Sequence, residues 1–338
     1  MAKIRVGING FGRIGRTAFK IVSKKPSMEV VGINDLLDTQ TLAHLLKYDT
    51  VYGRFDLPVD QDGKNLIVNK RKIPVTAFKD PTLLPWKSLK ADVVLECTGR
   101  YTKDGEAAAH IKAGAGRVIV SAPVHGGGIE TFLLGVNDKK YSGQQVISNA
   151  SCTTNCVSPV AAVLQNKFGI VKGMMTTIHA YTAEQNLVDG PPPALKRDLR
   201  RARAAAANII PTTSGVADAM QAVLPELSGK FDGLALRVPV LTGSISDFTV
   251  LVSRKTSIEE VNLAFLEYSR NPMYKHILEV TNDPIVSSDV IGNTHSAIVD
   301  LGLTRVLDGD LVKVFAWYDN EWGYASRLVE EVELVMKS

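Results

Sequence analysis

Residues 3–15 read Lys-Ile-Arg-Val-Gly-Ile-Asn-Gly-Phe-Gly-Arg-Ile-Gly, and this stretch decides the fold of the first half of the chain. Its β-branched start predicts a strand, and the apolar residues that follow Gly15 at helical spacing predict a helix. Gly10, Gly12 and Gly15 form the pattern G-x-G-x-x-G, and Asp35 stands at the end of the next predicted strand. Strand, glycine turn, helix and acidic residue in this order predict a dinucleotide-binding βαβ unit.

Each part of this motif has its own physical task. Gly10 permits a tight turn, Gly12 lets a pyrophosphate approach the backbone, and Gly15 lets the helix pack closely on the strand. The helix N-terminus then offers free N–H groups to the anion. Asp35 would accept hydrogen bonds from the ribose and repel a 2′-phosphate, which favours NAD over NADP. The alternative, a plain glycine turn beside a surface aspartate, leaves the combination of all four features unexplained.

The rest of the chain divides into two kinds of pattern. Short apolar strands alternate with helical stretches up to about residue 150, which predicts βαβ units and a parallel, doubly wound sheet. After about residue 165 the predicted strands are longer and alternate in polarity, which is typical of an antiparallel sheet. Ser257 and Glu260 fit a capping box, and 326–336 form an amphipathic C-terminal helix. We therefore expect an α/β domain followed by an α+β domain with a mostly antiparallel sheet.

Composition narrows the class of protein. The chain has 338 residues, 45% of them hydrophobic and 22% charged, which predicts about two globular domains and excludes a disordered protein. The net charge of +4 is too small to argue for nucleic-acid binding. Three cysteines imply no disulfide framework. No targeting or membrane-spanning segment is visible, so the expected location is the reducing cytoplasm.

One cysteine stands where a nucleophile would be activated. Cys152 lies between a predicted strand and an apolar helical run, with Ser151 as a candidate cap. A helix N-terminus stabilises an anion, so we expect this position to lower the pKa of the thiol. The flanks of Cys152 are Ser and Thr, which disfavours a purely structural role. Cys97 and Cys156 lie in apolar surroundings and are expected to be buried structural residues.

A histidine at a strand end is the candidate proton partner of this thiol. His179 follows the apolar run 174–178, whereas the other five histidines lie in helices, loops or polar stretches. A structural role for His179 stays open from spacing alone. Lowering a thiol pKa from ~8.5 to ~6 raises the thiolate fraction roughly thirtyfold at pH 7 but costs roughly tenfold in nucleophilicity. The histidine should therefore matter most for moving protons and stabilising an oxyanion.

Five motifs in order now carry a resemblance: Asn-Gly-Phe-Gly-Arg-Ile-Gly-Arg (9–16), Ser-Ala-Pro (121–123), Ser-Asn-Ala-Ser-Cys-Thr-Thr-Asn (148–155), His-Ala-Tyr-Thr (179–182) and Trp-Tyr-Asp-Asn-Glu-Trp-Gly-Tyr (317–324). Together they resemble phosphorylating glyceraldehyde-3-phosphate dehydrogenase, essentially end to end. The resemblance implies an NAD-binding Rossmann domain over 1–150 and 319–338, and a catalytic domain over 151–318. It also implies a homotetramer, with neither a membrane, a nucleic acid nor a metal as a partner.

The resemblance further implies a reaction. Cys152 would attack the aldehyde of D-glyceraldehyde 3-phosphate, His179 would act as base, NAD would take the hydride, and inorganic phosphate would release the thioester. The implied phosphate-binding residues are Ser151, Thr153, Thr182, Ser214, Gly215 and Arg237. The implied cofactor-binding residues are Gly10, Phe11, Gly12, Arg13, Ile14, Gly15, Asp35, Thr98, Gly99, Ser121, Asn320 and Tyr324.

Departures from the family pattern leave alternatives open. Ser214 stands where the family commonly has Thr, the loop 125–128 carries three glycines, and the Pro-rich loop 189–207 is longer than in many relatives. That loop holds five basic residues, Lys196, Arg197, Arg200, Arg201 and Arg203. They fit intersubunit ion pairs and an anion site better than nucleic acid, because no aromatic residues are interleaved. Erythrose-4-phosphate dehydrogenase, which releases its acyl group to water, and an NADP-accepting variant are the rival enzymes.

Overall fold

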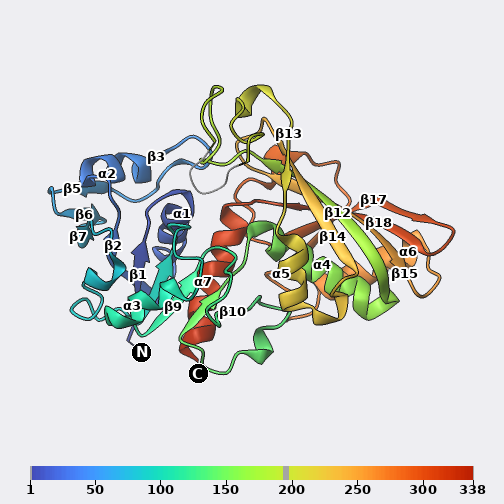
Figure 1. Cartoon of the computed structure of the whole chain (residues 1–338), viewed down its shortest axis with the longest axis horizontal. Helices are drawn as coiled ribbons and strands as arrows, with labels where there is room; N and C mark the ends of the chain where they lie inside the picture. Colours follow the sequence, from blue (N-terminus) through green and yellow to red (C-terminus); the bar gives the residue numbers. More distant parts are fainter. Residues whose placement is uncertain (1, 193–197, 338) are drawn as a thin grey trace. The chain divides into compact units, whose positions relative to one another are not determined.

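A computed structural model describes residues 2–192 and 198–337 (Figure 1). Its packing divides the described residues into two compact units. Unit 1 comprises 2–132, 140–151 and 325–337, and unit 2 comprises 133–139, 152–192 and 198–324. The C-terminal segment thus belongs to the same unit as the glycine-rich turn. No helix in the described residues is long and apolar enough to cross a membrane.

Within the described residues, unit 1 is built on a nine-stranded sheet in the order β10-β11-β9-β8-β1-β2-β7-β6-β5. The strands, in that order, are Glu130–Thr131, Val146–Ser148, Arg117–Val120, Val93–Glu96, Ile4–Asn9, Met28–Asn34, Arg71–Thr76, Asn65–Val68 and Val59–Gln61. All pairs are parallel except the hairpins at the β7-β6-β5 edge. Since β2 and β8 flank β1, the strand order reverses there, and ligands of such sheets bind at the carboxyl ends beside that reversal.

Helices cover this sheet and complete its core. They are α1 (Arg13–Val22), α2 (Thr39–Lys47), α3 (Ala109–Lys112) and the part of α7 (Trp322–Met336) from residue 325 on. The apolar stripe expected near the C-terminus is confirmed, because Leu328, Val329, Val332 and Val335 are fully buried in the core around β1. A 3-10 turn over Glu106–Ala108 precedes the four-residue helix α3.

Within the described residues, unit 2 holds a seven-stranded sheet in the order β13-β14-β12-β15-β18-β17-β16. The strands, in that order, are Ile210–Thr213, Phe231–Val238, Ile170–Ala180, Ser244–Val252, Leu311–Tyr318, Ala297–Leu307 and Leu278–Thr281. Four neighbouring pairs are antiparallel, whereas β12/β14 and β16/β17 are parallel. The mostly antiparallel sheet expected from the sequence is therefore present, with two parallel exceptions.

The helices of unit 2 are α4 (Cys152–Phe168), α5 (Val216–Val223) and α6 (Ile258–Ser269). The predicted cap of α6 is present, because the Ser257 hydroxyl accepts a hydrogen bond from the Glu260 N–H at 3.3 Å. Sequence reasoning missed β17, one of the longest strands. Its pairing with β18 shifts register between Asp300 and Arg305, so its alternation of polar and apolar residues is interrupted.

Candidate active site

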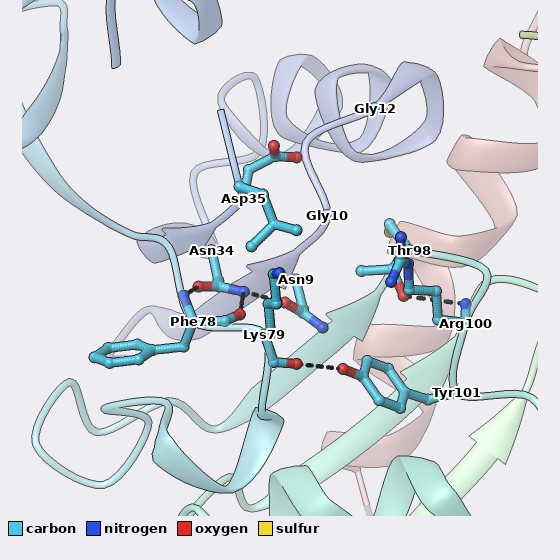
Figure 2. A pocket seen from close by; sticks show the side chains of 12 residues that line it. Asn9, Gly10, Gly12, Asn34, Asp35, Phe78, Lys79, Thr98, Arg100 and Tyr101 are labelled. Atoms are coloured by element: carbon cyan, nitrogen blue, oxygen red, sulfur yellow. Dashed lines mark hydrogen bonds between the residues drawn. The ribbon is translucent and has the colours of Figure 1, made fainter. Parts of the chain in front are cut away.

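A pocket of about 260 Å³ lies in unit 1 at the carboxyl ends of β1, β2 and β8 (Figure 2). Its lining consists of Asn9, Gly10, Gly12, Asn34, Asp35, Leu36, Phe78, Lys79, Cys97, Thr98, Arg100 and Tyr101. Four of the predicted cofactor residues are in this set: Gly10, Gly12, Asp35 and Thr98. Phe11, Arg13, Ile14 and Gly15 lie in the adjoining turn and the first turn of α1, and Gly99 follows Thr98.

The three motif glycines serve different purposes. Gly10 has a φ of +89°, which L side chains rarely adopt. A Cβ on Gly15 would lie 2.1 Å from the Gly10 carbonyl oxygen, so this position requires glycine for packing. A Cβ on Gly12 would meet nothing within 4 Å, and no side chain caps the N-terminus of α1. The open space before these uncapped N–H groups fits a pyrophosphate.

The space around Gly15 is filled and the space around Gly12 is open, so the two alanine variants should behave differently. We expect Gly15→Ala to destabilise the protein severely, because the new methyl group would collide with backbone. We expect Gly12→Ala to keep the wild-type melting temperature but to lose NAD affinity, because its methyl group would occupy the space of the ligand. Thermal unfolding and NAD titration of both variants check this. Unchanged NAD affinity in Gly12→Ala would contradict the assignment of that space.

Hydrogen bonds and an ion pair fix three of the predicted cofactor residues, Asp35, Arg13 and Ser121. Asp35 accepts hydrogen bonds from the Phe11 N–H at 2.7 Å and the Leu37 N–H at 3.0 Å. The Arg13 guanidinium pairs with Asp49 at 2.9 Å, so its side chain is already engaged. The Ser121 N–H donates to the Glu96 carbonyl oxygen at 2.9 Å. The structure thus ties Asp35 directly to the glycine turn.

The candidate nucleophile and base meet in unit 2. Cys152 is the first residue of α4, His179 lies near the end of β12, and the Sγ–Nε2 distance is 3.3 Å. His179 Nδ1 lies 2.6 Å from the Ala180 carbonyl oxygen, which can only accept. We assign the ring proton to Nδ1 on the strength of this shorter contact, which leaves the Nε2 lone pair facing the sulfur; the Arg237 Nη1 lies 3.0 Å from the same Nδ1.

Burial controls the charges of this pair. Burial, reinforced by the Arg237 charge, lowers the pKa of His179 to about 3. Burial raises the pKa of Cys152, although the Arg237 charge and the Thr153 N–H act in the opposite direction. The expectation that the helix N-terminus lowers this pKa was therefore wrong in its net direction, because desolvation outweighs it. At neutral pH the pair is a thiol beside a neutral imidazole that can accept the thiol proton.

Cationic side chains surround this pair. Arg237 stands opposite His179 in the β12/β14 register, and its Nη1 donates to the Ala180 carbonyl oxygen at 2.9 Å and the Thr182 hydroxyl at 3.4 Å. Burial and the charge of Arg201 lower the pKa of Arg237. The Arg237 charge acts on the thiol and the Arg201 charge acts on Arg237 and His179, so this end of the sheet favours an anion.

Sequence reasoning named Arg201 only as one of five basic residues suited to intersubunit ion pairs and an anion site, without separating it from the others. Its side chain is only 4% exposed, and it contacts Glu184 at 2.6 Å and the Thr212 hydroxyl at 2.9 Å. In the sequence it stands among four other basic residues, so its burial could not be recognised. Of those residues, Arg203 pairs with Asp189 at 2.7 Å, and Lys196 and Arg197 lie outside the described residues.

A second missed residue is Tyr318. Its hydroxyl lies 3.1 Å from the Thr153 hydroxyl and 2.8 Å from the Thr177 hydroxyl. The centroids of the Tyr318 and His179 rings are 6.0 Å apart in a T-shaped arrangement. It thereby connects the start of α4 to β12 and fixes the two elements that carry the pair. The signal was present in the sequence, because Tyr318 lies within the motif 317–324.

Asn320 is oriented by three donors. Its amide oxygen accepts from the Thr242 hydroxyl at 3.2 Å, the Gly243 N–H at 3.1 Å and the Ser244 hydroxyl at 3.0 Å. This fixes the amide, so that its nitrogen points to the other side as a donor. Tyr324, the last residue of the motif, is buried.

The other predicted residues stand at helix starts. Ser214 and Gly215 directly precede α5, whose N-terminus has no side-chain cap, and Ser151 directly precedes α4. Of the two cysteines expected to be buried, Cys156 is buried, whereas Cys97 is partly exposed beside the cofactor pocket. Burial raises the pKa of both thiols, that of Cys97 to about 12, which disfavours the reactive thiolate form of each.

The fold and these residues define a dinucleotide-dependent oxidoreductase with a cysteine–histidine pair. Residues 4–104 match the model of the glyceraldehyde 3-phosphate dehydrogenase NAD-binding domain, and residues 151–320 match that of its C-terminal domain. The chain belongs to the glyceraldehyde-3-phosphate dehydrogenase family, and its cofactor is NAD.

Relatives named glyceraldehyde-3-phosphate dehydrogenase match almost the whole chain. The protein from Mycobacterium bovis is 52% identical over 343 residues, covering 99% of both chains. That from Thermotoga maritima is 52% identical over 336 residues, covering 98% of this chain and 99% of the relative. That from Geobacillus stearothermophilus is 51% identical over 329 residues, covering 97% and 96%.

Proposed function

We propose that this protein oxidises D-glyceraldehyde 3-phosphate to 1,3-bisphosphoglycerate with NAD and inorganic phosphate, in glycolysis and gluconeogenesis. The observation that carries the proposal is the thiol of Cys152 at 3.3 Å from a neutral His179 imidazole, beside the Arg237 cation. A neutral base next to a thiol permits nucleophilic attack without a preformed ion pair.

The chemistry follows from this pair. His179 Nε2 takes the thiol proton as the sulfur attacks the aldehyde carbon, and returns it to the new alkoxide, giving a thiohemiacetal. It then takes the hydroxyl proton as a hydride leaves the same carbon, giving a thioester. NAD supplies the hydride acceptor. Inorganic phosphate attacks the thioester carbonyl, the C–S bond breaks, and the leaving thiolate of Cys152 is reprotonated.

Two anion sites serve the substrates. We assign the substrate phosphate to Thr182 and Arg237, whose hydrogen bond already brings hydroxyl and guanidinium together. We assign the attacking phosphate to Ser151, Thr153, Ser214 and Gly215. The hydroxyl of Ser214 preserves the donor that threonine supplies in the family. The charge of Arg201 supports both assignments, because it acts on His179 and Arg237 through space.

Two residues are proposed to orient the two ends of NAD. The amide nitrogen of Asn320 is proposed to bind the nicotinamide carboxamide, because its oxygen is already occupied by three donors. The Asp35 carboxylate is proposed to bind the adenosine ribose and to disfavour NADP by repelling a 2′-phosphate.

We further propose a cytoplasmic homotetramer. Large apolar side chains of unit 2 are exposed, among them Met174 at 73%, Leu187 at 80% and Val188 at 75%. A contiguous exposed apolar patch is typical of a surface that a partner covers, and Leu187 and Val188 are adjacent in the sequence. A reducing compartment would keep Cys152 as a free thiol.

The proposed reaction is tested by omitting phosphate. With purified protein, glyceraldehyde 3-phosphate and NAD, we expect steady NADH formation with phosphate and only about one equivalent per active site without it. Steady turnover that does not depend on phosphate would contradict the reaction and favour a hydrolytic relative.

The proposed role of Asp35 is tested by replacing NAD with NADP. We expect a kcat/KM lower by at least about tenfold, a free-energy difference of ~1.4 kcal/mol.

A further inference from the structure

A row of polar side chains crosses four neighbouring strands of unit 1 beneath the cofactor pocket. Its members are Glu96 on β8, Asn9 on β1, Asn34 on β2 and Thr76 on β7. They are register partners in pairs: Asn9 stands opposite both Glu96 and Asn34, and Asn34 stands opposite Thr76. Because the strands are parallel, the four side chains leave the sheet on one face at the carboxyl ends.

The hydrogen bonds of this row all run in one direction. The Thr76 hydroxyl donates to Asn34 Oδ1 at 2.9 Å, and Asn34 Nδ2 donates to Asn9 Oδ1 at 2.7 Å. Asn9 Nδ2 then donates to Glu96 Oε2. An amide can accept at one end and donate at the other, whereas a carboxylate only accepts. Glu96 therefore sets the orientation of both asparagine amides.

Two further buried side chains hold Glu96 in place. The Trp86 indole N–H donates to His110 Nδ1 at 3.0 Å, so the imidazole proton is on Nε2. Nε2 lies 2.9 Å from Glu96 Oε2 and donates to it. Trp86, His110 and Glu96 are each at most 1% exposed, so these bonds form without competition from water.

The second oxygen of Glu96 holds the opposite side of the pocket. Glu96 Oε1 accepts from the Thr98 N–H at 2.7 Å and from the Thr98 hydroxyl. The Thr98 hydroxyl in turn accepts from the Arg100 N–H at 3.1 Å. One carboxylate group thus fixes the turn after β8 through one oxygen and the polar row through the other.

Asn9 and Asn34 of the row, and Thr98 and Arg100 of the turn after β8, line the pocket, whereas Glu96 stands behind them (Figure 2). Figure 2 shows Asn34 bonded to Asn9 and Phe78 on one side, and Thr98 bonded to Arg100 on the other. Asn34 accepts from the Phe78 N–H and donates to the Phe78 carbonyl oxygen, so the row also fixes that segment. Asp35, the proposed ribose ligand, directly follows Asn34.

We propose that Glu96 is a positioning residue for NAD: through Thr98 on one side and Asn9 and Asn34 on the other, it holds both walls of the adenosine end of the pocket in the binding geometry. The inference rests on the NAD site of the proposed function. It assigns Glu96 no contact with the reacting atoms, so its loss should affect cofactor affinity and leave the chemical step unchanged.

Glu96→Gln tests this with almost no change in shape. The new amide nitrogen either faces the donors on Asn9 and His110 or faces those of Thr98, so one wall must rearrange. We expect Kd for NAD and for ADP-ribose to rise at least about tenfold, because a buried hydrogen-bond partner is lost. We expect kcat at saturating NAD to stay within about threefold. Glu106→Gln, which changes an exposed carboxylate of the same unit, is the matched control and should bind both ligands like wild type.

His110→Phe keeps the proposal testable if Glu96→Gln does not fold. It removes the ring nitrogen that donates to Glu96 Oε2 and leaves every pocket-lining side chain in place, and we expect a smaller rise in both dissociation constants with kcat retained. Wild-type affinity for NAD and ADP-ribose in a folded Glu96→Gln or His110→Phe variant would overturn the positioning role, and so would a fall in kcat with unchanged affinity. Failure of the wild-type protein to bind NAD would instead overturn the proposed function.

Discussion

We expect Cys152→Ser to abolish aldehyde oxidation and to leave NAD binding intact. We expect kcat to fall by at least about 10⁴-fold, a loss typical of removing an enzymatic nucleophile. A serine hydroxyl beside a neutral imidazole is a far weaker nucleophile than a thiol, and it would have to form an oxygen ester in place of the thioester. The pocket in unit 1 contains no part of Cys152, so the Kd for NAD should be unchanged. Steady-state kinetics and NAD titration on one preparation measure both quantities.

Cys156→Ser is the matched control for this variant. Cys156 lies one turn further along α4, is fully buried, and its sulfur lies 3.8 Å from the Ala316 carbonyl oxygen. We expect it to retain turnover, with any loss confined to thermal stability. Substantial activity in Cys152→Ser, or its loss in a stable Cys156→Ser, would contradict the assignment of the nucleophile.

His179→Asn should have the next largest effect. The structure gives this residue a lone pair on Nε2 directed at the sulfur and a proton on Nδ1 held by the Ala180 carbonyl oxygen. Loss of a positioned general base costs about 10²–10⁴-fold, so we expect kcat to fall by that factor. His44→Asn, a change at an exposed position on α2, should leave kcat unaltered. A His179→Asn variant with wild-type kcat would remove the base from the mechanism.

The shifted pKa values of His179 and Cys152 predict how the reactivity of the thiol depends on pH. Burial lowers the pKa of His179 to about 3, so the imidazole stays neutral from pH 5 to 9. Protonation of His179 therefore does not change the reaction rate within this range. Burial raises the pKa of Cys152, so the thiolate fraction of the free protein keeps increasing as the pH rises through 9. The rate of alkylation by iodoacetamide should therefore rise continuously from pH 7 to 9. A plateau below pH 7 would show that a thiolate–imidazolium pair forms in the free protein.

Much of the fold was predictable, because local signals and the global topology agree. The glycine turn of residues 10–15, the strand before it and Asp35 define the first βαβ unit by spacing alone. The strands at 59–76 and the long strand β17 were not predicted. They pair at an edge or through a register shift, where the period of the hydrophobic pattern breaks down.

The site was predictable only where a residue type carries its own chemistry. Cys152 and His179 stand out because few side chains can act as nucleophile and base, and strand and helix ends mark them. Arg201 and Glu96 do not stand out, because their roles depend on burial and on partners far away in sequence. The direction of the Cys152 pKa shift was also beyond sequence reasoning, since it depends on how much water the fold removes around the sulfur.

The central claim is that oxidation proceeds through a thioester on Cys152, and mass spectrometry of the protein tests it directly. Glyceraldehyde 3-phosphate and NAD are added without phosphate, the reaction is quenched in acid, and the peptides are mapped. The account predicts a phosphoglyceroyl adduct on Cys152 alone, which disappears when inorganic phosphate is added before quenching. NADH formation without an adduct on Cys152, or an adduct that persists in the presence of phosphate, would contradict the account.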